Sequence, residues 1–205
     1  MKILIATANK HKLKEITEIL NDLPIDLISI DQLPQQIEVE ETGNTFEENA
    51  RLKAEAYFKL SGLPTLADDS GLEVPALNNE PGVRSARYAG EQANYLKNNL
   101  LLLERMKNLK GSNRRAQFRC VVCFKTNKGE WFFEGKTSGM IITGFKGQGG
   151  FGYDPLFYIP ELGKTYAELS AEEKNKISHR GLALKEFKPF LKRYLKKFDK
   201  EHGKF

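Results

Sequence analysis

Two adjacent carboxylates follow a short apolar run in the first half of the chain. Asp68 and Asp69 come directly after residues 64–67, which we predict to be a strand that ends there, and Ser70 comes next. Successive strand residues point in opposite directions, so at least one carboxylate should project beyond the sheet. With Glu41 on a second loop, this arrangement predicts a magnesium–phosphate site, since Mg²⁺ binds one or two carboxylates together with water and phosphate oxygens. An Asp closing a Ser-Gly turn would explain the same residues structurally.

A polar segment lies where the first predicted strand, residues 3–6, passes into the first predicted helix. Backbone amides at a helix N-terminus attract anions, and lysines are unfavourable there unless an anion is bound. The segment therefore predicts a polyphosphate-binding loop made of Thr7, Ala8, Asn9, Lys10, His11 and Lys12. It lacks a Gly-rich Walker sequence, which excludes a P-loop nucleotidase.

Residues 147–152 satisfy the G-x-G-x-x-G pattern of dinucleotide-binding proteins. A strand is predicted after this segment where a Rossmann site needs a helix, so that site is rejected. Two interpretations stay open. The glycines allow a flat ligand to approach the backbone beside an exposed Phe151 ring, or they form a flexible loop.

Lys174, His179 and Arg180 place three hydrogen-bond donors within seven residues. Such a patch can contact carbonyl or phosphate oxygens. The alternative is a solvated loop between two helices, because charged side chains are mostly exposed.

Cys120 and Cys123 resemble a metal or redox pair. They lie on a predicted strand, where residues three apart point to opposite faces, so they are not expected to share a metal.

The elements that must position these residues indicate an α/β protein. Apolar spacing and turn residues predict strands at 3–6, 26–30, 64–67, 115–125, 131–134 and 156–159, helices from about 10, 46 and 94, and an amphipathic C-terminal helix over 182–200. Thr45 and Glu48 form a capping box for the second helix. We therefore expect a single domain over residues 1–205, two-lobed, with a mixed sheet flanked by helices and the active site in a cleft between the lobes.

Composition bounds the class of protein. The 205 residues are 40% hydrophobic and 29% charged with 13 Phe, and the mean hydropathy is −0.49. These values exclude a membrane protein and a disordered chain. Two cysteines give no disulfide framework, so we expect a cytoplasmic setting.

The net charge of +5 belongs to one segment. Residues 185–205 carry eight basic and three acidic side chains, which leaves residues 1–184 neutral with 24 of each. The body therefore lacks a basic groove, which argues against a single-strand nucleic-acid binding module.

Six ordered sequence blocks resemble the inosine triphosphatase family of non-canonical purine nucleoside triphosphate pyrophosphatases. They are Thr7-x-Asn9-x-x-Lys12, Glu41-Thr42-Gly43 with Glu48-Asn49-Ala50, residues 67–72, residues 81–87, residues 149–155 and residues 177–181. One departure is Ala8, where bacterial relatives often carry Gly. The resemblance covers nearly the whole chain.

The resemblance implies hydrolysis of the α–β bond of ITP, dITP or XTP by a Mg²⁺-dependent homodimer. Residues 7–12 and Lys53 would bind the triphosphate, and Ser70 would touch the substrate. Glu41 and Asp69 would hold the metal, with Asp68 as a candidate third carboxylate, and Asp69 would accept the proton of the attacking water. The base pocket would comprise Phe151, Gly152, Tyr153, Asp154, Lys174, His179 and Arg180. A pyrophosphatase for canonical or modified pyrimidine nucleotides is the alternative enzyme.

Overall fold

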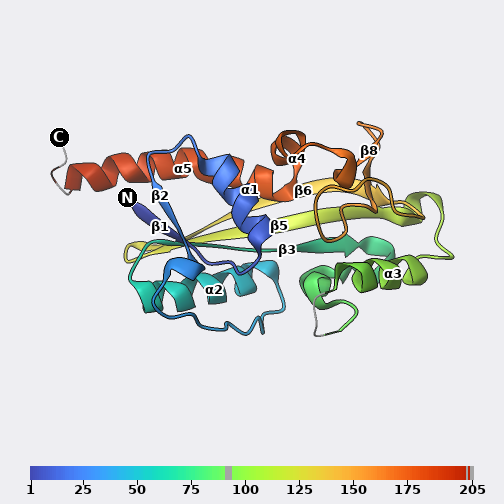
Figure 1. The fold of residues 1–205 in the computed structure, drawn as a ribbon, viewed down its shortest axis with the longest axis horizontal. Coiled ribbons are helices and arrows are strands. Elements are labelled where there is room, and N and C mark those ends of the chain that lie inside the picture. Colours follow the sequence, from blue (N-terminus) through green and yellow to red (C-terminus); the bar gives the residue numbers. More distant parts are fainter. Residues whose placement is uncertain (91–93, 202, 204–205) are drawn as a thin grey trace. The chain divides into compact units, whose positions relative to one another are not determined.

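The chain forms one mixed β-sheet with helices packed against it (Figure 1). The computed structural model describes residues 1–90, 94–201 and 203. In these residues eight strands follow the order β2-β1-β3-β5-β6-β7-β8, with β4 paired to β3. They are β1 (Lys2–Ile5), β2 (Asp26–Ser29), β3 (Thr65–Val74), β4 (Glu80–Pro81), β5 (Arg115–Thr126), β6 (Gly129–Ile141), β7 (Phe157–Ile159) and β8 (Lys164–Thr165). The β1 pairings with β2 and β3 are parallel, whereas β6–β7 and β7–β8 are antiparallel, so the predicted mixed α/β class is confirmed.

Five α-helices lie in the described residues. They are α1 (Lys10–Leu20), α2 (Phe46–Ser61), α3 (Tyr95–Arg105), α4 (Ala171–Ile177) and α5 (His179–Glu201). Asn9 caps α1, and the predicted capping box of Thr45 and Glu48 opens α2. No helix in the described part of the chain has the length and apolarity needed to cross a membrane.

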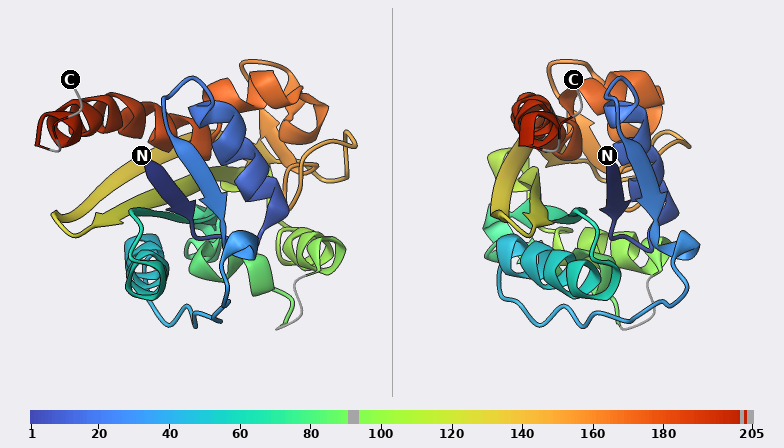
Figure 2. Two further views of the ribbon diagram at one scale, coloured as in Figure 1. Left: turned by 60° about the vertical axis from the view of Figure 1, so that its left-hand side comes forward. Right: turned by 90° about the vertical axis from the view of Figure 1, so that its left-hand side faces the viewer.

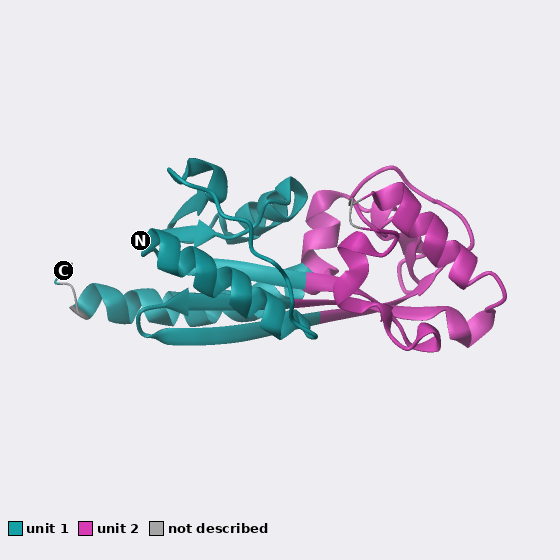
Figure 3. Cartoon of the chain, turned by 90° about the horizontal axis from the view of Figure 1, so that it is seen from below, with its two compact units in different colours: residues 1–69, 121–135, 180–205 teal, residues 70–120, 136–179 magenta. Residues whose placement is uncertain are grey.

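Contacts divide the chain into two compact units (Figure 3). Unit 1 comprises residues 1–69, 121–135 and 180–205, and unit 2 comprises residues 70–120 and 136–179. The cleft between two lobes stays a prediction.

In unit 1, α1 and α5 cover one face of the strands and α2 covers the other (Figure 2). On the α2 face, Ala50, Ala54 and Tyr57 pack against Leu4 and Cys123 in a buried cluster. On α5, Phe187, Leu191 and Leu195 are buried while the lysines between them are mostly exposed, so the predicted amphipathic pattern of this helix has a packed face. Lys204 lies outside the described residues.

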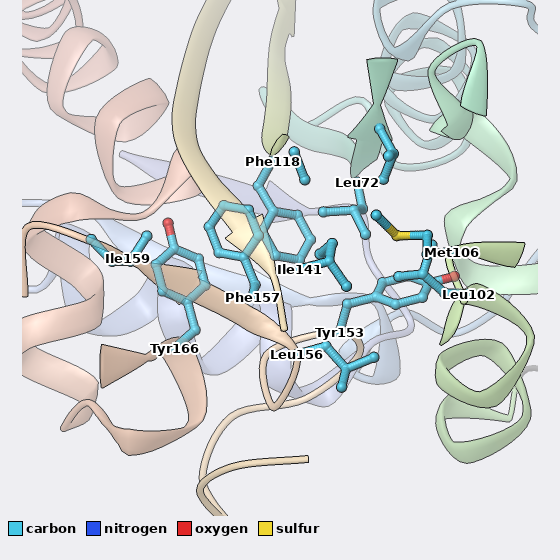
Figure 4. Packing of buried hydrophobic residues seen from close by; sticks show 12 residues of the cluster. Leu72, Leu102, Met106, Phe118, Ile141, Tyr153, Leu156, Phe157, Ile159 and Tyr166 are labelled. Atoms are coloured by element: carbon cyan, nitrogen blue, oxygen red, sulfur yellow. The ribbon is translucent and has the colours of Figure 1, made fainter. Parts of the chain in front are cut away.

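Unit 2 has its own hydrophobic core (Figure 4). Leu72 of β3, Phe118 of β5 and Ile141 of β6 pack with Leu102 of α3 and with Tyr153. This core supports the glycine-rich segment 147–152 from beneath, because Tyr153 and Leu156 belong to it.

Three predicted boundaries are wrong, and each error has a physical cause. The strand predicted to end at residue 67 continues to Val74, because Asp68 and Asp69 are buried among charged and polar partners. β6 continues to Ile141 through Gly139, where a side chain would collide with the Phe157 ring. The C-terminal helix begins at His179, so His179 and Arg180 lie in its first turn and are buried, which rules out a solvated loop.

Candidate active site

Asp69 is a buried carboxylate held by two groups of α2. Its Oδ2 accepts a hydrogen bond from Asn49 Nδ2 at 3.1 Å, and its Oδ1 lies 3.6 Å from Lys53 Nζ. Burial raises the pKa of Asp69 above its usual value, and the positive charges of Lys53 and Lys12 offset only part of this effect. A carboxylate with a raised pKa is better suited to accept a proton than an ordinary surface Asp.

Glu41 also contacts the Lys53 ammonium group. Lys53 Nζ donates a hydrogen bond to Glu41 Oε1, so the ammonium group lies between the carboxylates of Glu41 and Asp69. Burial alone would lower the pKa of Lys53, but the negative charges of Asp69 and Glu41 raise it. Lys53 therefore stays protonated.

The residues around Lys53 fit the oxygen donors that Mg²⁺ prefers. Glu41 and Asp69 supply two carboxylates that already share one cation, and Mg²⁺ commonly takes one or two carboxylates with water and substrate oxygens completing its shell. In the part of the chain that the structure describes, no group of three or more Asp, Glu, His or Cys side chains forms a metal-binding cluster. A magnesium ion here would depend on its substrate for further ligands.

Asp68 contacts a different set of residues from its neighbour Asp69. Its Oδ2 lies 3.1 Å from Lys12 Nζ and 2.9 Å from Arg180 Nη2, on the side covered by α1 and α5. Burial by itself would raise the pKa of Asp68, but the charges of Lys12 and Arg180 outweigh it and hold the pKa well below the usual range. Asp68 is therefore a permanent anion that orients Lys12.

Arg180 is a structural partner of two carboxylates. It donates to Asp68 and, through Nη1, to Glu15 of α1, and it is 1% exposed. These contacts lie within unit 1, whereas Lys174, its predicted companion, contacts residues of unit 2. The predicted role of Arg180 in the base pocket stays a prediction.

Three backbone amides of the predicted phosphate loop are hydrogen-bonded within the loop. Asn9 Oδ1 accepts from the backbone N–H groups of His11 (2.9 Å) and Lys12 (3.2 Å), and Thr7 Oγ1 accepts from the N–H of Asn9. Helix capping explains these bonds. Ala8, Lys10 and His11 are exposed, so side chains rather than these capped amides are the available phosphate contacts.

In unit 2, Lys174 joins the end of the glycine-rich segment to α4. Its Nζ lies 2.6 Å from Asp154 Oδ2 and 4.6 Å from the centre of the Phe151 ring. Asp154 Oδ2 also accepts the backbone N–H of Phe151 at 2.9 Å. The structure thus brings together three of the residues predicted for the base pocket. His179 lies in the same unit with its ring stacked on Phe118 at a centroid distance of 4.6 Å.

Comparison with known proteins assigns the family. A model of the Ham1 family matches residues 3–190. The chain belongs to the Ham1 family. The dITP/XTP pyrophosphatase of Clostridium perfringens is 50% identical over 202 residues, which cover 95% of this chain and 99% of that protein. A dITP/XTP pyrophosphatase of Thermus thermophilus is 50% identical over 186 residues, covering 90% of this chain and 89% of that protein.

Solved structures of Ham1 proteins share the fold. The Ham1 protein of Staphylococcus aureus matches with a TM-score of 0.85 and 46% identity, covering 95% of this chain and all of that one. The HAM1 protein of Coxiella burnetii matches with a TM-score of 0.86 and 42% identity, covering 94% of this chain and 99% of that one. The family resemblance predicted from the six sequence blocks is confirmed.

The glycines of this Ham1 chain are explained by the protein's own packing. A side chain at Gly147 would lie 2.5 Å from the Ala167 backbone, and one at Gly150 would lie 2.0 Å from Asp154 Oδ2; both glycines have positive φ. Phe151 is half-buried, so its predicted exposure is wrong. At these two positions the packing and the positive φ account for glycine, and the approach of a flat ligand to this segment stays a prediction.

Two residues of the site were missed by sequence reasoning. Asn49 bonds both Asp69 and, through Oδ1, the backbone N–H of Gly43 at 2.8 Å, and Glu15 bonds Arg180. Asn49 could have been suspected, because a buried Asn near the start of a helix is a poor helix former. Glu15 gave no such signal.

Proposed function

We propose that this Ham1-family chain hydrolyses the α–β phosphoanhydride bond of ITP, dITP and XTP. The products are a nucleoside monophosphate and pyrophosphate, and the reaction removes non-canonical purines from the nucleotide pool. The names of the relatives in Clostridium perfringens and Thermus thermophilus support an enzyme of this class. The observation that carries the proposal is the buried Asp69 carboxylate with its raised pKa, beside Lys53 and Asn49.

In this mechanism a water molecule attacks the α-phosphorus and Asp69 accepts its proton. Lys12 and Lys53, with Thr7, Asn9, Lys10 and His11, contact the triphosphate, and the lysine charges stabilise the negative charge that develops on the leaving pyrophosphate. Ser70 contacts the substrate beside Asp69. Glu41 and Asp69 would hold Mg²⁺, which neutralises phosphate charge and lowers the pKa of a bound water.

The base is selected by donors that face the purine 6-position. ITP and XTP carry an oxygen there, whereas ATP carries an amino group. Lys174, His179 and Arg180 would supply donors, and Phe151 with residues 152–154 would form the wall of the pocket. Adenine would leave those donors facing another donor, and an unpaired buried group costs about 1–3 kcal/mol. Two mismatches would give a preference of roughly 10²-fold for ITP over ATP.

A panel of nucleotides tests the proposal. Purified protein is incubated with Mg²⁺ and ITP, dITP, XTP, GTP, ATP, UTP or CTP, and pyrophosphate release is measured. ITP, dITP and XTP should give the highest kcat/KM, and in ¹⁸O-water the label should enter the monophosphate. Label in orthophosphate, or a preference for pyrimidine nucleotides, would contradict the proposal.

We further propose a cytoplasmic homodimer, as the family resemblance implies. Light scattering on the purified protein tests this: a mass near twice the 23.3 kDa of the chain is expected, and a mass of one chain at micromolar concentration would contradict it.

A further inference from the structure

The first turns of α3 hold the segment before Asp154 through an asparagine. Asn99 is 2% exposed, and its Nδ2 donates to the carbonyl oxygens of Gly152 at 2.8 Å and Tyr95 at 2.7 Å. Its Oδ1 is buried and has no hydrogen-bond partner among the described residues. A buried acceptor without a partner lowers the stability of the fold. Stability alone therefore gives a poor reason for an Asn at this position.

The Gly152 carbonyl belongs to the central peptide of a turn. The backbone N–H of Asp154 donates to the Phe151 carbonyl at 3.2 Å, and Gly152, the second residue of this turn, has a φ of +63°. Turns with positive φ at this position occur in two forms that differ by a flip of the central peptide. The bond from Asn99 to Gly152 is made in only one of those orientations.

Tyr153 fixes the other side of the same peptide. Its hydroxyl donates to the Ser85 carbonyl at 2.9 Å, and its ring is 4% exposed in the core of unit 2, in the same cluster as Leu102 and Met106 (Figure 4). Ser85 is itself fixed, since its Oγ accepts the backbone N–H of Leu72 at 2.9 Å. The hydroxyl of Tyr153 is thus an anchor to the sequence block 81–87, for which the chemistry proposed above has no other use.

We propose that Asn99 and Tyr153 are positioning residues that hold the turn of residues 151–154 in the orientation that selects the purine base. This inference rests on the proposed function. Phe151, the first residue of the turn, lies 6.2 Å from the Tyr95 ring and beneath the Lys174 ammonium. A flip of the Gly152–Tyr153 peptide would present an N–H where the turn now presents the Gly152 carbonyl. Discrimination between a 6-oxygen and a 6-amino group would then fall, while the hydrolytic groups of unit 1 would be unchanged.

The test compares two neighbouring buried asparagines. Asn99→Leu removes the bond to Gly152 and also the unpartnered oxygen. Asn98→Leu is the matched control for the bond to Gly152: Asn98 is equally buried, but its oxygen accepts the Ala89 N–H and its Nδ2 donates to the carbonyls of Ser85 and Ala86. The Ser85 carbonyl also accepts the Tyr153 hydroxyl, and in this variant Ser85 keeps its bond to the Leu72 N–H. Tyr153→Phe is the second test variant, since it removes one hydroxyl and keeps the ring. Each is assayed for Tm, for kcat and KM with ITP and ATP, and for hydrogen exchange of the 147–156 peptide without ligand.

Asn99→Leu and Tyr153→Phe should each lower the ITP-to-ATP ratio of kcat/KM about fivefold, the effect of one net hydrogen bond. In Asn99→Leu the kcat for ITP should stay within about twofold, and in both variants the amides of residues 151–154 should exchange about fivefold faster, as expected for one lost hydrogen bond. Both asparagine variants should lower the Tm, because each leaves carbonyl groups without their donor, but Asn98→Leu should keep the ITP-to-ATP ratio. Unchanged exchange, or faster exchange with an unchanged ratio, would overturn the inference. A wild-type protein without ITP preference would instead overturn the proposed function, and the base-selection role with it, whatever the exchange shows.

Discussion

Asp68 and Asp69 are neighbours in β3, yet their pKa values are shifted in opposite directions. Asp68 is held below its usual range by Lys12 and Arg180, and Asp69 is raised by burial against α2. The alternation of a strand produces this difference, because it sends the two carboxylates to opposite faces. Asp68 is therefore held as an anion, whereas Asp69 is the carboxylate that we propose as the proton acceptor.

The first prediction concerns activity. Asp69→Asn should lower kcat for ITP by about 10²-fold or more, because the amide cannot accept the proton and is a weaker metal ligand. The Tm should change little, since the substitution removes a charge that burial disfavours and leaves Lys53 paired with Glu41. Steady-state kinetics at saturating Mg²⁺ check this, and a variant that keeps half of the wild-type kcat would assign the base to another residue.

The second prediction concerns stability and the neighbouring residue Asp68. Asp68→Asn should destabilise the fold by about 3–5 kcal/mol, because it removes the partner of buried Arg180 and of Lys12. For a chain of this size the Tm should fall by roughly 10 °C. Calorimetry measures this loss, with the exposed pair mutant Glu55→Gln as a control that should keep its Tm. An unchanged Tm would show that the network around Arg180 does not support the fold.

The third prediction concerns competition between the Lys53 ammonium and Mg²⁺ for the same two carboxylates. Its ammonium contacts both Glu41 and Asp69, the carboxylates proposed to bind Mg²⁺. Lys53→Met removes this competing cation, so the free protein should bind Mg²⁺ more tightly, while the KM for ITP should rise because a phosphate contact is lost. Calorimetric titration with MgCl₂ and steady-state kinetics check both effects. Lys59→Met, which lies on the exposed face of the same helix, should change neither. Weaker Mg²⁺ binding by Lys53→Met would contradict the placement of the metal.

The fourth prediction concerns the cysteines. Cys120 and Cys123 are buried thiols, and burial raises the pKa of the Cys123 thiol to about 12. The thiolate is the reactive form, so a thiol reagent such as Ellman's reagent at pH 8 should label neither residue in the native protein. Both should react after unfolding in guanidinium chloride. Rapid labelling of the folded protein would show that the strand opens at this point.

Local rules predicted those parts of the fold that are encoded over a few residues. The capping box of Thr45 and Glu48 opens α2 as predicted, because side chains three residues apart make these bonds. The same local rules placed the end of β3 at residue 67, whereas the strand continues to Val74. They treat consecutive polar residues as the end of a strand, and this rule fails where each charge finds a buried partner, as Asp68 and Asp69 do.

The rest of the site depends on contacts between distant parts of the sequence. The pair Asp68–Arg180 joins residues 112 positions apart in the sequence, and Arg51 donates a hydrogen bond to Glu130, which lies 79 positions further along the chain. No spacing along the chain encodes such pairs, so sequence reasoning predicted neither the Asp68–Arg180 pair nor the contact of Arg180 with Glu15. Family resemblance predicted the roles of Glu41, Lys53 and Asp69, and the structure adds that the Lys53 ammonium contacts both carboxylates.

The last prediction tests base selection at Lys174. Its ammonium is buried, pairs with Asp154 and lies over the Phe151 ring. Lys174→Ala should therefore have two effects. The Tm should fall, because the Asp154 carboxylate loses its buried partner at a cost of about 3–5 kcal/mol, and the preference for ITP over ATP should fall because a donor to the 6-oxygen is lost. The preference for ITP over GTP should barely change, since both bases carry that oxygen. Lys164→Ala, an exposed lysine of the same unit, should change neither quantity. An equal loss of kcat/KM for ITP and ATP in Lys174→Ala would instead mean that Lys174 contacts the phosphates, and the donor account of base choice would then be wrong.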